Sequence, residues 1–340
     1  SPANRSFQRN GCRLQAFTEP VAAYRPFLII PICMLVTTKE AVLPIHLVFP
    51  LFSSVVFVLG MILAKQAIAR GASPWTGTFL GNLWLGLIWA AIAVYRGAVV
   101  PVEAWPAAAI IGLLFVCGQL FTYLAYELGD VSVATPVLGV KVLMVALLTS
   151  MLAHETVPSV IWISGVLACV GIVLIQWTGR SVGTEDNPPR TGLAILMALC
   201  AALSLSLFDV CLQTWAKGQW DSFAFLPVMF GTAALLSLGF LPKVDSLRRL
   251  QHMKATKWLI GGTLLMATQA MSMCYCLAHF GDAPRINIVY ALRGLWGVLL
   301  AWLLSKGLRT NEASVDRRVM FRRLAGAVLL TGAVLLAVTT

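Results

Sequence analysis

The chain has 340 residues, of which 59% are hydrophobic and only 11% are charged, and its mean hydropathy is +0.84. An ordinary soluble domain carries roughly 25% charged residues, so this composition excludes a soluble globular enzyme. The basic residues lie between apolar blocks. The formal charge of +11 therefore indicates lysine and arginine beside membrane spans and does not indicate a nucleic-acid surface.

The first 43 residues lie outside the apolar pattern of the rest of the chain. Arg5, Arg9, Arg13 and Arg25 precede an apolar stretch, Pro26–Val36, that is too short to cross a bilayer. We expect residues 1–43 to form a basic, disordered N-terminal tail. A targeting segment is the alternative interpretation.

The remainder of the chain contains ten apolar runs that are long enough to span a membrane. A bilayer core about 30 Å thick requires roughly 20 mostly apolar helical residues. The runs are Pro44–Ala69, Pro74–Tyr95, Ala104–Tyr126, Val131–Ala153, Pro158–Trp177, Thr191–Trp215, Ser222–Leu241, Trp258–Ala278, Pro284–Ser305 and Phe321–Val338. The sequence therefore predicts an all-α polytopic membrane protein with ten transmembrane helices.

The two halves of the chain show signs of an internal repeat. A shift of about 152 residues superposes Gly129-Asp130 on Gly281-Asp282 and Lys141 on Arg293. We therefore predict a first five-helix repeat over residues 44–177, a linker over 178–190 and a second five-helix repeat over 191–340. An odd number of spans inverts the second repeat relative to the first.

Signatures of catalysis and of metal binding are missing from the sequence. There is no G-x-x-x-x-G-K-[ST] loop and no G-x-S-x-G motif, and His154-Glu155 is not followed by a second histidine at metalloprotease spacing. We therefore predict that the protein is not an enzyme and uses no cofactor or metal. A membrane-embedded enzyme or lipid-handling protein is the rival interpretation, although no nucleophile and base can be named for it.

The most informative residues are two cations near the centres of the predicted fourth and ninth spans, Lys141 and Arg293. A charged side chain at that depth costs about 2.5–3.5 kcal/mol on insertion scales and marks a functional site by default. Two cations that face one interior repel each other unless an anion lies between them. We predict that both bind an anionic group of a substrate. The structural alternative is that each pairs with a carbonyl, a helix end or an acid elsewhere.

Asp209 is the acidic residue of the predicted sixth span, and its counterpart in the first span is the uncharged Ile62. Two roles stay open for this carboxylate. A raised pKa in a low-dielectric site would suit proton coupling, with protons as the coupling ion. Equally, Asp209 could neutralise Lys141 or Arg293.

Four further side chains are expected to line the same cavity as the two cations. They are Gln119, Tyr123, Tyr275 and Trp296. Interhelical hydrogen bonds or anchoring at the membrane interface explain these residues nearly as well.

The order of spans, the Gly-Asp connectors and the proline-containing central linker resemble the EamA-like branch of the drug/metabolite transporter superfamily. The resemblance covers residues 44–338 and includes the glycines of the fifth and tenth spans, in Gly165–Gly171 and Gly326–Gly332. Glu155 is similar to a frequent family glutamate after the fourth span, whereas Lys306–Arg309 departs from the pattern after the ninth.

The resemblance implies export or exchange of a small metabolite through a central cavity by alternating access. Phosphate-binding translocators of the superfamily carry basic residues in the fourth and ninth spans, which is similar to Lys141 and Arg293 and favours an anionic or zwitterionic substrate. Small multidrug resistance proteins carry an essential first-span glutamate that is absent here. Asp209 occupies a similar place in the second repeat, so proton-coupled export of cationic drugs stays as the alternative.

We expect a multi-pass protein of a bacterial inner membrane whose partners are the lipid bilayer and a small-molecule substrate. Fourteen basic residues lie on the side of the odd-numbered connectors: Arg70, Arg180, Arg190, Lys243, Arg248, Arg249, Lys254, Lys257, Lys306, Arg309, Arg317, Arg318, Arg322 and Arg323. The positive-inside rule would place that side in the cytoplasm, which is the reverse of the usual family topology. The sequence leaves orientation, oligomeric state and the identity of the solute open.

Overall fold

The computed structural model describes residues 44–99, 101–128, 131–176, 191–305 and 317–339, all within the compact unit Glu40–Thr340. The predicted tail 1–43, the connector Gly129-Asp130 and the linker 178–190 lie outside the described residues. The described residues contain helices and no strand. The predicted class, an all-α polytopic membrane protein, is confirmed.

Eight of the described helices are long and apolar enough to cross a membrane. They are α2 (Ile45–Ile68), α3 (Pro74–Arg96), α4 (Trp105–Leu128, after the 3₁₀ helix η1, Val102–Ala104), α7 (Ser159–Gln176), α8 (Thr191–Ala216), α9 (Ser222–Ser237, continued by the 3₁₀ helix η2, Leu238–Lys243), α11 (Thr256–His279) and α14 (Arg317–Val338). A short helix, α10 (Leu247–His252), lies in the connector between α9 and α11.

The predicted fourth and ninth spans differ from the prediction because each is divided into two helices. The fourth consists of α5 (Val131–Gly139) and α6 (Lys141–Leu152), and the ninth consists of α12 (Ala283–Tyr290) and α13 (Arg293–Ser305). Two of the ten predicted spans are therefore interrupted, and they are interrupted at equivalent positions of the predicted repeat.

The two interruptions are turns in which backbone hydrogen bonds reach back three residues instead of four. At the first, Val140 N–H donates to Val137 C=O, and Pro136, inside α5, cannot donate a backbone hydrogen bond at all. At the second, Leu292 N–H donates to Val289 C=O. A 3₁₀ turn inside a longer helix often marks a hinge.

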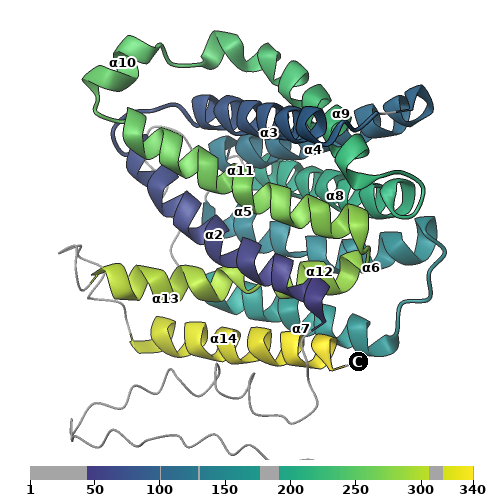
Figure 1. Ribbon diagram of the computed structural model, residues 1–340. Helices are drawn as coiled ribbons and strands as arrows, with labels where there is room; N and C mark the ends of the chain where they lie inside the picture. The colour runs from purple at the N-terminus through teal and green to yellow at the C-terminus, as the bar shows by residue number, and fades with distance from the viewer. Residues whose placement is uncertain (1–43, 100, 129–130, 177–190, 306–316, 340) are drawn as a thin grey trace, which may run out of the picture. The chain divides into compact units, whose positions relative to one another are not determined.

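The helices pair in a way that stays the same when the two halves of the chain are exchanged. α2 packs on α11 and α4 packs on α8, while α3 packs on α9 and α7 packs on α14 (Figure 1). If α2 to α7 are matched in order with α8 to α14, leaving out the short helix α10, the first two contacts exchange with each other and the last two map onto themselves. This pairing is the arrangement that a two-fold axis relating two inverted repeats would produce.

The contact between α7 and α14 depends on glycine. A Cβ atom on Gly326 would lie 2.7 Å from the carbonyl oxygen of Gly171, and one on Gly171 would lie 2.9 Å from that of Gly326. Without side chains at these positions the two backbones approach closely, as is typical of helix pairs in membranes. Gly332, the other glycine of its sequence motif, has open space around it.

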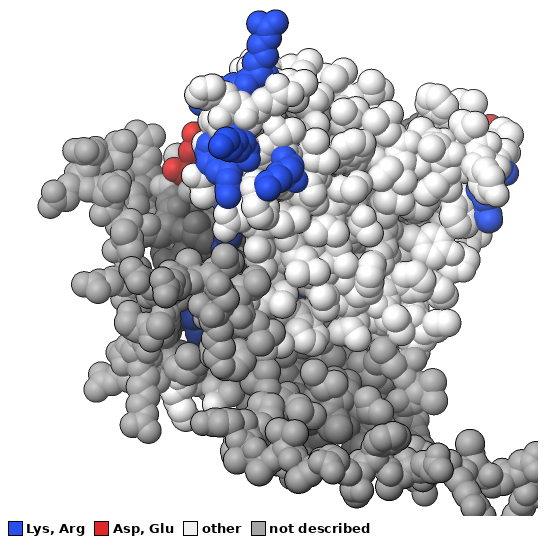
Figure 2. Space-filling model, turned by 60° about the vertical axis from the view of Figure 1, so that its left-hand side comes forward, with Lys and Arg blue, Asp and Glu red and all other residues white. Residues whose placement is uncertain are grey.

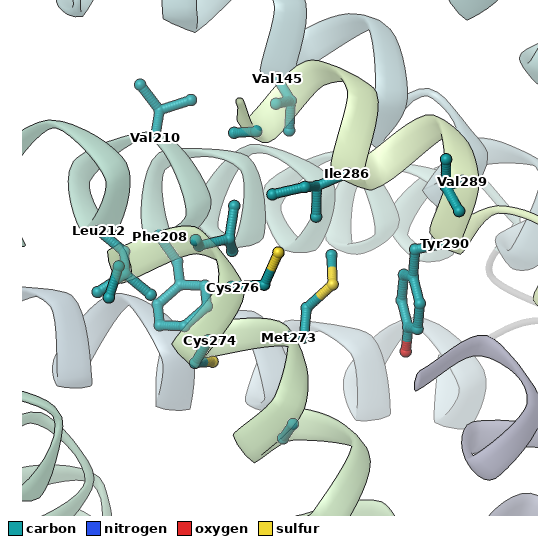
Figure 3. Packing of buried hydrophobic residues seen from close by; sticks show 14 of the residues in the cluster. Val145, Phe208, Val210, Leu212, Met273, Cys274, Cys276, Ile286, Val289 and Tyr290 are labelled. Carbon is teal, nitrogen blue, oxygen red and sulfur yellow. The ribbon is translucent and has the colours of Figure 1, made fainter. Parts of the chain in front are cut away.

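The visible charge lies at the margins, and most of the buried side chains are apolar. Figure 2 shows a broad uncharged surface on which Lys and Arg gather near the edges. Such a surface suits a lipid environment, with the basic side chains at the ends of the helices. Figure 3 shows Ile286 of α12 close to Met273 and Cys276 of α11, with Phe208 of α8 nearby, and all four belong to one buried cluster.

Candidate functional site

A buried ion pair joins the two halves of the chain. Lys141 is the first residue of α6, and its Nζ lies 2.8 Å from Oδ2 of Asp209 in α8. The side chain of Asp209 is 2% exposed and that of Lys141 is 15% exposed. A single charge in such a place costs several kcal/mol, and an oppositely charged partner offsets that cost. Of the two roles predicted for Asp209, this contact supports charge balance.

Asn287 of α12 completes this pair and is the residue that the sequence reasoning missed. Its Nδ2 donates to Oδ2 of Asp209 at 2.8 Å and to the carbonyl oxygen of Ala283 at 3.0 Å. Asn287 is 3% exposed. The signal that would have found it is an amide between two isoleucines, in the same predicted span as Arg293.

Arg293, the first residue of α13, has no carboxylate within 4.0 Å among the residues that the structure describes. Its guanidinium carbon lies 4.5 Å from the ring centre of Tyr290 and 5.1 Å from that of Phe57 in α2. Aromatic faces stabilise a cation but do not cancel its charge. The Tyr290 hydroxyl donates to Oε1 of Gln269 at 2.9 Å, which fixes this ring beside Arg293.

Lys141 and Arg293 line one small cavity of about 20 Å³, together with Asn287 and Tyr290. The other lining residues are Leu138, Gly139, Val142, Ile172 and Ala291. A space of roughly 10–15 Å³ is enough for a water molecule, so this small cavity has room for a water and not for a metabolite. The structure thus brings together the two cations that the repeat predicts to share a site.

Both cations lie at the N-terminal end of a half-helix, directly after the interruptions at residues 140 and 291–292. The N-terminal end of a helix carries a partial positive charge, which adds to the positive charge of the side chain there. The interruption also frees backbone groups: the carbonyl oxygen of Gly139 accepts a hydrogen bond from the Cys169 thiol at 3.4 Å. Interrupted helices of this kind hold the substrate sites of many transporters.

The other polar residues predicted for the cavity do not line it. Gln119 of α4 exchanges two hydrogen bonds with Asn82 of α3, at 2.8 and 3.1 Å. The indole N–H of Trp296 donates to the hydroxyl of Ser54 at 2.9 Å. Both contacts join neighbouring helices, which was the alternative interpretation of these residues.

Tyr123 and Tyr275 lie near opposite ends of the helices, in two equivalent groups of side chains. In the Trp75 cluster, the Trp75 ring lies 5.5 Å from that of Tyr123 and 4.2 Å from Nζ of Lys243. In the Phe223 cluster, the Phe223 ring lies 5.5 Å from that of Tyr275 and 4.2 Å from the guanidinium carbon of Arg96. Each cluster joins the start of α3 or α9 to the end of the other helix.

Glu155, which follows α6, takes part in a polar connection at the end of the helices that holds the Phe223 cluster. Its Oε2 accepts a hydrogen bond from Nε2 of Gln213 in α8 at 3.0 Å. Oε1 of the same Gln213 accepts from the backbone N–H of Ala283, the first residue of α12, at 2.6 Å. Buried Gln213 therefore connects the segment after α6, the helix that begins with Lys141, to the start of α12, the helix that precedes Arg293.

Comparisons with known proteins agree with this arrangement. Residues 44–177 match the EamA-like transporter family. A solved structure, described as a crystal structure of protein, is 18% identical to this chain, with 84% of this chain and 98% of that chain covered at a TM-score of 0.58. At this identity the similarity concerns the fold. A comparison with curated proteins gives no match.

The matched family consists of membrane transporters and not of enzymes, and the apolar helices described above have the length and composition that such proteins require. The chain is thus an integral, multi-pass membrane protein. Residues 44–177 of the chain match the EamA-like transporter family, which is a family of the drug/metabolite transporter superfamily.

Proposed function

We propose that the chain is a secondary transporter, an exporter or exchanger, of a small polar metabolite that carries an anionic group, either alone or as part of a zwitterion. The observation that carries this proposal is the cavity shared by Lys141 and Arg293. Among the described residues around it, Asp209 is the one carboxylate that is paired with either cation. The local balance is therefore one unmatched positive charge.

The unmatched charge belongs to Arg293. Lys141 meets Asp209 of α8, whereas Arg293 meets the ring of Phe57 in α2, the helix that corresponds to α8 in the first half. The shift of 152 residues that relates Lys141 to Arg293 relates Asp209 to this Phe57, so the sequence counterpart of Asp209 is Phe57 and not Ile62 as predicted, and it is uncharged. The repeat thus supplies two cations and one acid, and an anionic ligand at Arg293 would complete the balance. Guanidinium groups bind carboxylates and phosphates with two parallel hydrogen bonds, which suits this role.

Alternating access is the mechanism that fits a small cavity in a bundle with similar clusters at both ends of the helices. A metabolite needs more space than the about 20 Å³ present, so entry requires one end of the helices to open. The Trp75 cluster and the Phe223 cluster each join α3 to α9, at opposite ends. In the proposed cycle, one cluster separates while the other stays closed, and the turns beside Lys141 and Arg293 bend.

The first test is thermal stabilisation of the detergent-purified protein by amino acids, organic acids, sugar phosphates, nucleosides and cationic drugs. A ligand that binds only the folded state stabilises it by about 2.7 kcal/mol at a concentration 100 times its Kd. We expect an anionic or zwitterionic compound to stabilise the wild type. In Arg293→Gln and Lys141→Gln, its Kd should rise by at least about tenfold, which corresponds to roughly 1.4 kcal/mol.

Matched controls are Lys65→Gln and Arg322→Gln, which change exposed residues outside the cavity and should leave binding unchanged. If anions have no effect and a cationic drug stabilises the protein in an Asp209-dependent way, the proposal is wrong and proton-coupled drug export replaces it. Stabilisation by an anion that persists in both cavity variants would also contradict the proposed site.

A further inference from the structure

We propose that Asn287 is a specificity-determining residue, which limits the site to ligands with a single anionic group. This inference rests on the proposed function. By holding Asp209 against Lys141, Asn287 leaves Arg293 as the cavity cation that no carboxylate of the described residues matches. A ligand with one carboxylate and a neutral or zwitterionic remainder completes the charge balance, whereas a dianion adds an unmatched negative charge.

The geometry of Asn287 explains why Asp209 stays with Lys141. One amide hydrogen of Asn287 is anchored on the carbonyl oxygen of Ala283 in its own helix, and the other is donated to Oδ2 of Asp209. The Nζ of Lys141 approaches the same oxygen at the same distance of 2.8 Å. Two donors on one oxygen hold the carboxylate in a fixed orientation. Asn287 and Arg293 both line the cavity, so this contact keeps Asp209 paired with Lys141 and not with Arg293.

The amide of Asn287 can be exchanged for a charged group of nearly the same shape. Asn287→Asp would supply a second carboxylate, and the count would become two cations and two acids. Asp209→Asn would have the opposite effect and leave two cations without an acid. Charges in a buried site interact more strongly than they do in water, so each change should dominate the ligand preference.

The experiment compares two pairs of ligands of similar size, butyrate with succinate and glutamine with glutamate, by binding to the purified full chain. The readout is the ratio of the two Kd values within a pair, because this ratio does not depend on the folded fraction. We expect the wild type to favour the ligand with one anionic group by at least about tenfold. Asn287→Asp should weaken binding of that ligand by at least about tenfold. Asp209→Asn should reverse the preference in favour of succinate and glutamate.

The double variant Asn287→Asp/Asp209→Asn tests the charge count itself. It restores one acid for two cations, with the acid moved from α8 to α12, and should regain the wild-type preference. The matched control is Asn82→Asp, which alters a buried amide of α3 outside the cavity and should lower stability without changing the ratio.

The outcomes separate this inference from the proposed function. If the wild type prefers the dianion, or if Asp209→Asn leaves the ratio unchanged, the role of Asn287 is refuted while anion binding at Arg293 still stands. If Asn82→Asp weakens binding of the ligand with one anionic group as much as Asn287→Asp does, the effect is structural and the inference fails. If neither member of a pair binds and a cation does, the proposed function itself is wrong.

Discussion

Lys141 and Arg293 occupy equivalent places in the two halves of the chain but have different surroundings. Lys141 shares a carboxylate oxygen with an amide, and Arg293 lies against two aromatic rings. The first environment neutralises a charge and the second tolerates one. The difference arises from Asp209, since the residue 152 positions earlier is the apolar Phe57, which lies against Arg293 and supplies no second acid.

The ion pair between Lys141 and Asp209 should have a measurable effect on the free energy of unfolding. Removal of one partner leaves the other charge unpaired, so Lys141→Met or Asp209→Leu alone should lower the free energy of unfolding by about 3–5 kcal/mol. The double variant Lys141→Met/Asp209→Leu should recover most of that loss, because two apolar side chains replace the pair. Reversible unfolding in mixed detergent micelles measures all three. A double variant as unstable as the sum of the single ones would show that the pair is not coupled.

The two cations could be predicted from the sequence because a charge inside an apolar run is conspicuous and recurs at the repeat distance. Asn287 is not singled out, because a lone amide inside a span is explained as readily by interhelical hydrogen bonding as by a binding role. The residue 152 positions before Asn287 is Thr135, a residue type that is common between membrane helices. Comparison of the two halves therefore does not single out Asn287. Gln119 and Trp296 show the converse: polar atoms inside spans also satisfy one another between helices, and the sequence does not tell which neighbour they meet.

At the scale of helices, the two features that shape the site are the interruptions next to Lys141 and Arg293. Counting apolar residues predicts where a span lies, but not how its backbone hydrogen bonds run. Pro136 indicates the first interruption, whereas the second, at Ala291-Leu292, has no proline beside it, since Pro284 lies in the first turn of α12. The two glycine motifs had a clearer meaning, because the backbones of α7 and α14 approach each other closely at Gly171 and Gly326.

The glycine contact gives a second stability prediction. Gly326→Val would place side-chain atoms against the backbone of Gly171 and against Ile175, and overpacking of this kind costs about 1–3 kcal/mol. Gly332→Val is the matched control, because a Cβ there meets nothing within 4 Å. We expect the first variant to melt several degrees below the wild type and the second to melt near it. Equal melting temperatures would contradict the close approach of α7 and α14.

At the scale of the whole membrane-embedded unit, the symmetric pairing of helices places the Trp75 cluster and the Phe223 cluster at opposite ends. The repeat of 152 residues that relates Lys141 to Arg293 also relates Tyr123 to Tyr275, one in each cluster. Sequence similarity between the halves was therefore a guide to three-dimensional equivalence even for residues that do not reach the cavity.

Truncation of the two clusters should have opposite effects on access to the cavity. A single cysteine at Leu138, which lines the cavity, can be labelled with a membrane-impermeant maleimide from either side of oriented vesicles, in a variant without native cysteines. Trp75→Ala should speed labelling from the end of the Trp75 cluster, and Phe223→Ala from the other end, each by several-fold. If both variants speed labelling from the same side, the clusters do not control access in turn.

The two clusters are similar but not identical, since one holds its cation on an indole ring and the other on a phenyl ring. An indole attracts a cation more strongly than a phenyl ring does. In a cycle that opens one end at a time, the difference in free energy between the clusters sets the populations of the two resting states, and about 1.4 kcal/mol gives a tenfold bias. The unloaded transporter should therefore rest with the Trp75 end closed. A substrate arriving from that end would show a weaker apparent affinity, because only a minor fraction of the molecules is open to it.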